Sequence, residues 1–153
     1  SRQSRGLGDV YKRQPIMYEY RCKVVHIVDG DTVDVDIDLG FGVWMKKQRI
    51  RLYGIDTPES RTRDLEEKKY GLAAKDFITK MLDDDGGITL KTHKDAEGKF
   101  GRILGELWRT TNYADQSINE YMVEKSHAVE YFGQSKEDIE KEHLENRELV
   151  TLL

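Results

Sequence analysis

The chain has 153 residues, of which 35% are charged and 37% are hydrophobic, and its formal net charge is −4 at pH 7. This length and composition suit one globular domain with its own core, and they argue against a disordered chain or two domains. No apolar run reaches the roughly 18 residues of a membrane span, so no membrane partner is expected.

Residues 1–16 differ from the rest because they are basic and lack an apolar period. Their segment GDVYKRQ is similar to a translated sequencing adaptor, so we expect a non-native or disordered extension and a natural start at Met17. The chain shows no apolar core of a secretory signal, which favours a cytoplasmic or phage-encoded intracellular protein over a secreted one.

Without that extension the chain has 21 basic and 28 acidic residues, a net charge of −7. Such a balance argues against binding nucleic acid through a broad basic surface, because that kind of binding neutralises many phosphates. A local site that contains its own cation remains compatible with the charge.

Alternating apolar residues predict three consecutive strands. The first covers residues 18–28 and contains the only cysteine, Cys22, which we interpret as a buried core thiol. Turn residues at 29–31 lead into a second strand over residues 32–39. After another glycine-rich turn, the third strand covers residues 43–53.

The apolar spacing becomes helical over residues 64–82, which predicts a helix there. Residues 88–93 and 102–110 predict two further strands joined by a turn-rich segment. Helix-capping signals at Ser117 and Ser135 predict two C-terminal helices, of which the last is very polar.

Three strands, a helix and two more strands are the order of a five-stranded Greek-key barrel of the OB type. We therefore predict a mainly β fold with helices (α+β) that forms one domain over residues 17–153. OB barrels commonly bind oligonucleotides, but the fold alone does not establish a function because it hosts many.

Two acidic clusters at strand ends could hold a metal ion. Asp29 and Asp31 flank the first hairpin turn, and Asp56 with the backbone carbonyl of Thr57 follows the third strand, where Pro58 stiffens the corner. Hard divalent cations take oxygen ligands of this kind. The clusters form one site if the strand ends converge, although DGDT by itself is more typical of an ordinary hairpin turn.

Other acidic residues and the histidines are interpreted without a site role. Asp34, Asp36 and Asp38 do not fit a calcium-binding loop, which needs glycine at its sixth and glutamate at its twelfth position, so we expect a solvated strand face. The histidines have no ligand spacing and are interpreted as structural or solvated: His26, His93, His127 and His143.

Phosphodiester cleavage needs a base and positive charge at the phosphate. Glu59, three residues after Asp56, could act as a general base on water. Planar guanidinium groups suit the extra negative charge on phosphorus, and Arg51 and Arg102 are the candidates. Taken singly, each arginine is more typical of a surface or barrel-rim charge, and it is the position of each beside the other candidate residues that favours a site role.

Five motifs resemble, in order and near the same spacing, those of the staphylococcal nuclease (thermonuclease) family. They are DGDT at 29–32, RLYGIDTPE at 51–59, KYG at 69–71, KFGR at 99–102 and INE at 118–120. The resemblance runs from about Val24 to Val129, and the five together are specific where any one would be weak.

The resemblance implies an OB-barrel, calcium-dependent phosphodiesterase that cleaves DNA and RNA and leaves 3′-phosphate ends. Its substrate would be single-stranded or locally open nucleic acid, and the enzyme would be a monomer; DNA or RNA preference and endo or exo mode stay open. Six positions match the family's site: Asp31, Asp56 and the Thr57 carbonyl for Ca²⁺, Glu59 for activating water, and Arg51 and Arg102 for the transition state.

The chain departs from the family in three places. Lys99 is kept, but Phe100 replaces a tyrosine, so a hydroxyl contact to a terminal phosphate would be absent. Tyr131 is the nearest candidate for a base-stacking tyrosine, with Phe132 next. The basic C-terminal helix is replaced by the acidic KEDIEKEHLENRE.

The alternative is a non-catalytic OB module that binds nucleic acid or protein, like the nuclease-like repeats of larger scaffold proteins. Those repeats typically lose the catalytic residues, so the joint presence of Arg51, Glu59 and Arg102 favours the enzyme. A third possibility, a purely structural barrel, predicts no affinity for nucleic acid.

Overall fold

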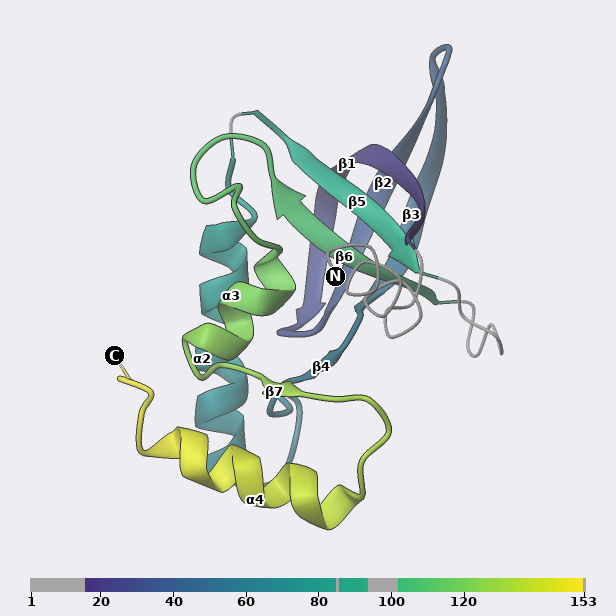
Figure 1. Cartoon of the computed structure of the whole chain (residues 1–153). Coiled ribbons are helices and arrows are strands. Elements are labelled where there is room, and N and C mark those ends of the chain that lie inside the picture. The colour runs from purple at the N-terminus through teal and green to yellow at the C-terminus, as the bar shows by residue number, and fades with distance from the viewer. Residues whose placement is uncertain (1–15, 85, 94–101, 153) are drawn as a thin grey trace, which may run out of the picture.

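The structure is a computed structural model that describes residues 16–84, 86–93 and 102–152 (Figure 1). The predicted non-native extension, residues 1–16, lies almost entirely outside the described residues. Lys99 and Phe100, in the turn before the last barrel strand, lie outside them as well.

Five strands form a closed barrel in the order β1-β2-β3-β6-β5. Neighbouring strands are antiparallel except for β3 and β6, which run parallel with Ile50 opposite Ile103. This arrangement confirms the predicted five-stranded barrel of the OB type. The barrel strands are β1 (Ile16–Asp29), β2 (Thr32–Gly40), β3 (Val43–Leu52), β5 (Ile88–His93) and β6 (Ile103–Arg109).

The inner face of the barrel is a continuous apolar core. Its fully buried residues come from several strands, because alternate side chains of each strand point inward; they include Val33, Val35, Ile50, Leu90 and Leu107. Cys22 is 5% exposed, which confirms the prediction of a core thiol. Burial raises the pKa of this thiol to about 12.

The alternation expected over residues 18–28 is interrupted in β1. The pairing of β1 with β2 shifts between Val24 and His26 and again between Ile27 and Asp29. Such bulges change which face a side chain occupies, so His26 is exposed although it has the same parity as Cys22.

The predicted helix over residues 64–82 is α2 (Leu65–Met81). The Asp64 side chain accepts hydrogen bonds from the backbone N–H groups of Glu66 and Glu67, which caps the helix N-terminus. Ala74 and Ile78 are fully buried on the face of α2 that joins the barrel core.

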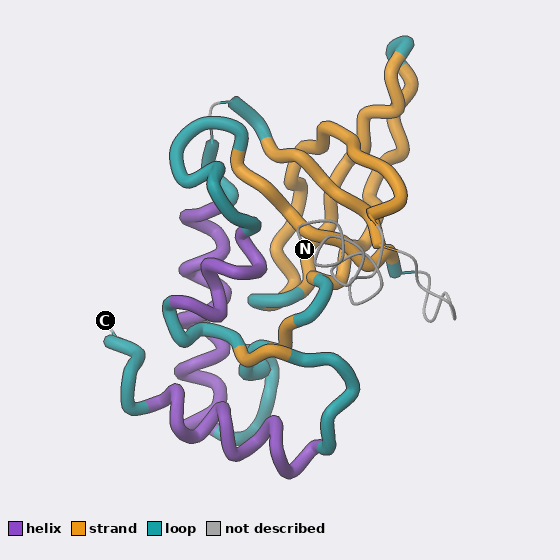
Figure 2. Tube along the Cα trace, in the orientation of Figure 1, coloured by secondary structure: helices purple, strands orange, loops and turns teal. Residues whose placement is uncertain are grey.

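Two further helices follow the barrel, as the capping signals predict. The first is α3 (Ile118–Glu124), capped by Ser117, and the second is α4 (Lys136–Arg147), capped by Ser135. Figure 2 shows the strands gathered on one side of the molecule and the helices on the other. Within the described residues, no helix is both long and apolar enough to cross a bilayer.

A small second sheet was not predicted from the sequence. It pairs β4 (Ile55–Asp56) with β7 (Val129–Glu130) in antiparallel register, with Asp56 opposite Val129. Two-residue strands leave no periodic signal, so only the tertiary structure reveals them. This sheet joins the corner after β3 to the segment that leads into α4 (Figure 1).

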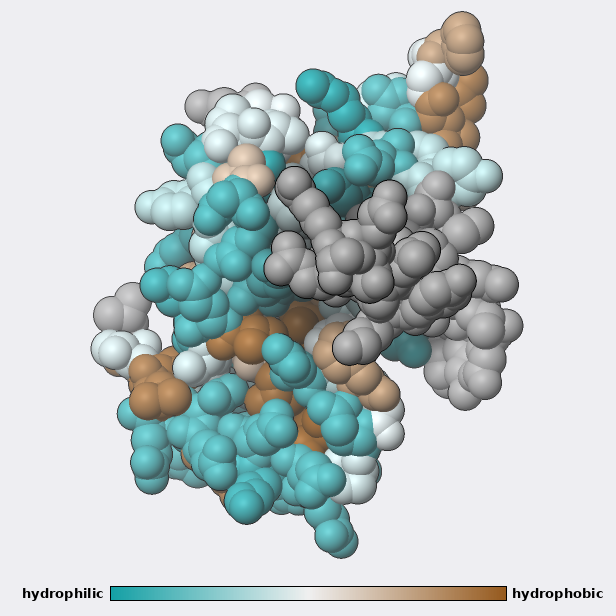
Figure 3. Space-filling view, in the orientation of Figure 1, coloured by the Kyte–Doolittle hydropathy of each residue, from teal (hydrophilic) through white to brown (hydrophobic). Residues whose placement is uncertain are grey.

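The β2–β3 hairpin extends beyond the barrel and ends in exposed apolar side chains (Figures 1 and 3). Phe41 at its tip is fully exposed. Closer to the barrel, Asp34 pairs with Arg49 at 2.9 Å and Asp36 pairs with Lys46 at 3.3 Å. The expectation of a solvated face is therefore wrong for these two aspartates, whose side chains are largely covered by cross-strand partners.

Candidate active site

The turn between β1 and β2 packs tightly against the corner that follows β3. A Cβ atom on Gly30 would lie 2.9 Å from Ala74 Cβ and 3.1 Å from the Thr57 side chain, so only glycine fits there. Asp29 accepts hydrogen bonds from the backbone N–H of Ser60, at 3.1 Å, and from the Ser60 hydroxyl. The two acidic clusters found in the sequence therefore do lie together.

Asp31 is buried at the centre of this junction. Its Oδ2 accepts a hydrogen bond from the Thr57 N–H at 3.1 Å, and its Oδ1 accepts one from the Thr32 hydroxyl at 3.0 Å. Burial raises the pKa of Asp31, while Arg51 and the Thr57 N–H oppose the rise and the charge of Asp56 adds to it. The site thus holds a carboxylate whose charge is costly to bury.

Arg51 bridges the two carboxylates. Its Nη1 lies 3.3 Å from Asp31 Oδ2, and its Nη2 lies 3.5 Å from Asp56 Oδ1. The Arg51 side chain is 16% exposed, so the guanidinium group is partly shielded from water. Asp31 Oδ2 and Asp56 Oδ1 therefore both face the guanidinium group of Arg51.

Asp56 has a second partner that the sequence did not reveal. Its Oδ2 lies 2.8 Å from Nε2 of His143, which comes from α4. The sequence suggested only a structural or solvated role for His143. The structure places it in contact with Asp56, a predicted calcium ligand. The 87 positions that separate the two residues left no spacing signal from which this contact could be predicted.

Glu59 lies on the corner between β4 and α2, and it is exposed. A Cβ atom on Gly71 of α2 would lie 2.2 Å from the Glu59 carbonyl oxygen, so the helix and this corner are in direct backbone contact. The charge of Glu59 also contributes, after burial, to the raised pKa of Glu67 on the first turn of α2.

A groove of about 710 Å³ opens beside these residues. Asp56, Thr57 and Glu59 form one side, and α4 forms the other through residues that include His143. Tyr131, the predicted base-stacking residue, also lines the groove, and its backbone N–H donates to the Gly54 carbonyl at 2.8 Å. The groove therefore brings together the predicted general base, a predicted ligand and an aromatic ring.

Arg102 immediately precedes β6, which begins at Ile103. Leu104, two residues later, lies opposite Arg51 in the parallel pairing of β3 with β6. The register therefore brings the start of β6, next to Arg102, beside the strand that carries Arg51. Lys99, the other predicted substrate contact, lies outside the described residues.

Phe132, the second candidate for base stacking, occupies a separate place. Its ring meets the Tyr53 ring edge to face, with 5.9 Å between the ring centres, and it lies over Gly54. Phe132 therefore lines a different pocket, of about 440 Å³, between β4 and α3. Of the two candidates, Tyr131 is the one that shares the groove with Glu59.

The donor set suits a hard cation. Among the described residues, no three acidic, histidine or cysteine side chains gather into a metal-binding group. The candidate set instead combines two carboxylates, Asp31 and Asp56, with the backbone carbonyl of Thr57, and calcium accepts such mixed oxygen ligands. The Thr57 hydroxyl is buried and has no hydrogen-bond partner among the described atoms.

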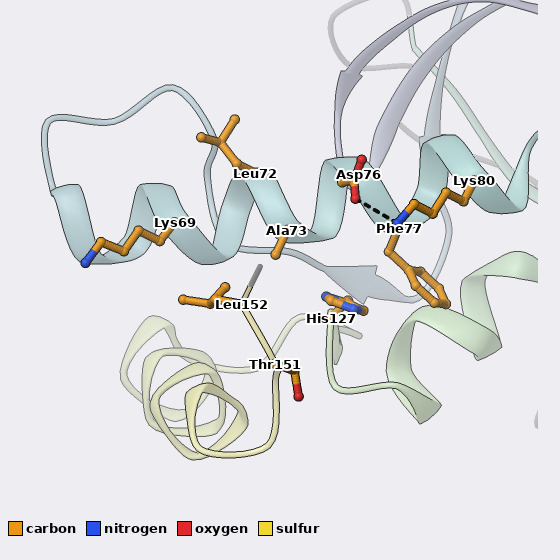
Figure 4. Close-up of a pocket in the computed structure, with 9 residues that line it drawn as sticks. All are labelled: Lys69, Leu72, Ala73, Asp76, Phe77, Lys80, His127, Thr151 and Leu152. Atoms are coloured by element: carbon orange, nitrogen blue, oxygen red, sulfur yellow. Dashed lines mark ion pairs between the residues drawn. The ribbon is translucent and has the colours of Figure 1, made fainter.

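A second groove, of about 560 Å³, lies on α2 near the C-terminal residues (Figure 4). His127 stacks on Phe77 there, with 4.7 Å between the ring centres, and burial lowers the pKa of His127. The acidic residue of this groove, Asp76, pairs with Lys80 at 3.2 Å. Because none of the predicted site residues lines it, the candidate active site is the groove beside Glu59.

Comparison of the sequence with profiles of known protein families identifies the family of this chain. The profile described as "Staphylococcal nuclease homologue" matches residues 49–150, which include Arg51, Asp56, Glu59 and Arg102. The chain belongs to the staphylococcal nuclease family. The match begins in β3 and includes the corner that carries Asp56 and Glu59.

Two of three similar proteins have names that state a nuclease activity, and the third is uncharacterized. A thermonuclease of Staphylococcus hyicus is 33% identical over 90 residues, 59% of this chain and 49% of the relative. The endonuclease YhcR of Bacillus subtilis is 26% identical over 119 residues, 74% of this chain and 9% of the relative. An uncharacterized protein of Bacillus anthracis is 32% identical over 124 residues, 80% of this chain and 53% of the relative. The chain thus spans about half the length of the first and third of these.

Proposed function

We propose that this staphylococcal nuclease homologue is a calcium-dependent nuclease that hydrolyses phosphodiester bonds of DNA and RNA and leaves 3′-phosphate ends. One observation carries the proposal: Arg51 bridges Asp31 and Asp56 at 3.3 and 3.5 Å beside the corner that carries Glu59. The thermonuclease and endonuclease named among the relatives support the same reaction class.

Calcium is proposed to bind to Asp31, Asp56 and the Thr57 carbonyl. When bound, the cation neutralises phosphate charge and orients the attacking water. Its charge would also offset the cost of burying the Asp31 carboxylate, the same cost that raises the pKa of Asp31.

The protein's own side chains would carry out the proton transfer and the charge stabilisation. Glu59 takes a proton from water, and the water oxygen bonds to phosphorus as the bond from phosphorus to the 5′ oxygen breaks. The 5′ oxygen takes up a proton from solvent and leaves as a hydroxyl group. The phosphate then remains on the 3′ end. Arg51 and Arg102 stabilise the additional negative charge on phosphorus, which is the largest contribution expected from the protein.

Substrate binding in this proposal is local. Tyr131 stacks on a base in the groove, and Lys99 contacts a phosphate. Single-stranded or locally open DNA and RNA fit such a site because their bases are accessible. The active unit would be residues 17–153 acting as a monomer.

Cleavage of labelled single-stranded DNA by the parent chain and by Glu59→Gln, each with calcium and with a chelator, tests the proposal. A general base typically contributes about 10²- to 10⁴-fold, so the variant should lose at least about 100-fold in rate. The chelator should abolish cleavage by the parent, and returning calcium should restore it.

Glu66→Gln provides a matched control, because Glu66 is also exposed but lies on α2 and pairs with Lys69 at 3.1 Å. Its cleavage rate should equal that of the parent. If the parent binds the strand but does not cut it in calcium, the catalytic proposal is wrong and the chain is a binding module.

A further inference from the structure

The C-terminal helix α4 lies against the active-site corner (Figure 1). It is held there by the buried side chain of Ile139 and by Asn146, whose Nδ2 donates to the Ala128 carbonyl at 3.2 Å. It also forms one side of the groove that Asp56 and Glu59 line. A very polar helix is thus packed where the proposed chemistry takes place.

His143 is the residue of α4 that reaches a proposed calcium ligand. Its Nε2 lies 2.8 Å from Asp56 Oδ2. The His143 side chain is 13% exposed and the Asp56 side chain is 33% exposed, so the hydrogen bond is partly shielded from water.

The two oxygens of Asp56 have different partners. Oδ2 faces His143, whereas Oδ1 lies 3.5 Å from Nη2 of Arg51. The same guanidinium group lies 3.3 Å from Asp31 Oδ2. The contact with His143 therefore fixes the carboxylate plane so that Oδ1 is directed to the side on which Asp31 lies.

We propose that His143 is a positioning residue, whose Nε2–H holds Asp56 Oδ2 so that Oδ1 is preorganised for calcium. The inference rests on the proposed function. His143 is not itself a ligand, because calcium takes oxygen ligands. Partners that orient metal-binding carboxylates typically change metal affinity by about 10- to 100-fold when they are removed.

Two replacements separate positioning from packing. His143→Leu removes the donor but keeps an apolar side chain on the helix, whereas His143→Gln keeps an N–H donor. If the hydrogen bond is what matters, the glutamine variant should recover affinity that the leucine variant loses. If His143 only holds α4 in place, neither variant should change calcium affinity while the protein stays folded.

Isothermal titration calorimetry, with calcium titrated into the full chain, measures calcium affinity independently of cleavage. His143→Leu should bind calcium about 10- to 100-fold more weakly than the parent, and His143→Gln should lie closer to the parent. Glu142→Gln, at the exposed neighbouring position, should bind as the parent does. Urea unfolding of each variant establishes that all are folded under the titration conditions.

Two results would contradict the role of His143 without contradicting the proposed function. Calcium affinity of His143→Leu equal to that of the parent would overturn that role, and so would equal losses in the leucine and glutamine variants. A parent chain that binds no calcium has a different meaning, because it overturns the proposed function together with this inference.

Discussion

At the scale of single residues, the site depends on close backbone contacts as much as on charged groups. Gly71 belongs to the KYG motif and has no reactive side chain. Its role becomes clear from the contact with Glu59, since a Cβ atom would lie 2.2 Å from the Glu59 carbonyl oxygen and 2.6 Å from the Ser60 nitrogen. The motif residue therefore sets how closely α2 approaches the corner that carries Glu59.

Gly71→Ala should consequently destabilise the protein and displace Glu59. Forcing an extra methyl group into a packed contact typically costs about 1–3 kcal/mol, and here the obstructing atoms belong to the backbone, which cannot rotate away. Urea unfolding measures the loss of stability, and the cleavage assay in calcium measures the expected loss of rate.

Lys68→Ala, on the exposed side of the same helix, should change the free energy of unfolding by no more than about 0.5 kcal/mol. An alanine at position 71 as stable and as active as the parent would contradict the assigned role of this contact.

At the scale of secondary-structure elements, α3 connects the end of β3, the strand that carries Arg51, to the neighbouring strand β6 through hydrogen bonds. Asn119, the central residue of the INE motif, donates from Nδ2 to the carbonyls of Tyr53 at 2.9 Å and Gly105 at 3.2 Å. Its Oδ1 accepts from the Leu107 N–H at 3.2 Å. One buried amide thus satisfies three backbone groups where β3 ends beside β6.

Asn119→Ala should cost about 2–4 kcal/mol in the free energy of unfolding, because each buried group left without a partner costs about 1–3 kcal/mol. Urea denaturation of the purified variant gives this value directly. Asn112→Ala is the matched comparison, since Asn112 is exposed, and it should lie within about 0.5 kcal/mol of the parent. Equal stabilities for the two variants would show that the hydrogen bonds of Asn119 do not stabilise the contact of α3 with β3 and β6.

The packing position of α4 could not be predicted from its sequence. Its residues are mostly charged, and of them only Ile139 is buried. An apolar stripe is the usual signal of helix packing, and α4 lacks a wide one. Its position depends on the single buried side chain of Ile139 together with polar contacts to Asp56 and Ala128.

At the scale of the whole molecule, the charge balance constrains how nucleic acid can bind. Residues 17–153 have a net charge of −7, so a strand would be repelled by most of the surface. In the proposed function, the attractive groups are few: Arg51, Arg102, Lys99 and one calcium ion.

This arrangement predicts a shallow salt dependence of binding. For single strands the slope of log K against log [salt] is about −0.7 per phosphate contact, so three basic contacts give a slope of about −2. Fluorescence anisotropy of a short labelled strand with Glu59→Gln in calcium measures the slope between about 50 and 200 mM salt. Adding Lys99→Ala should reduce its magnitude by about 0.7. A slope of about −5 or steeper would instead indicate a broad basic surface.

The sequence by itself determined the barrel strands, the three helices and the candidate residues of the site. Apolar periodicity predicted the barrel strands and α2, because period 2 and period 3.6 are recorded in residues a few positions apart. The motifs likewise indicated the family and the candidate residues Asp31, Arg51, Asp56, Glu59 and Arg102 before any contact was known.

Only the tertiary structure decided which of these elements meet. The junction of Asp29 with Ser60, the pairing of Asp56 with Val129 in the small sheet of β4 and β7, and the contact of His143 with Asp56 join residues that are 31, 73 and 87 positions apart. Closure of the barrel and packing of the helices create such contacts, and a local pattern carries no record of them because it reflects the conformation of its own segment alone.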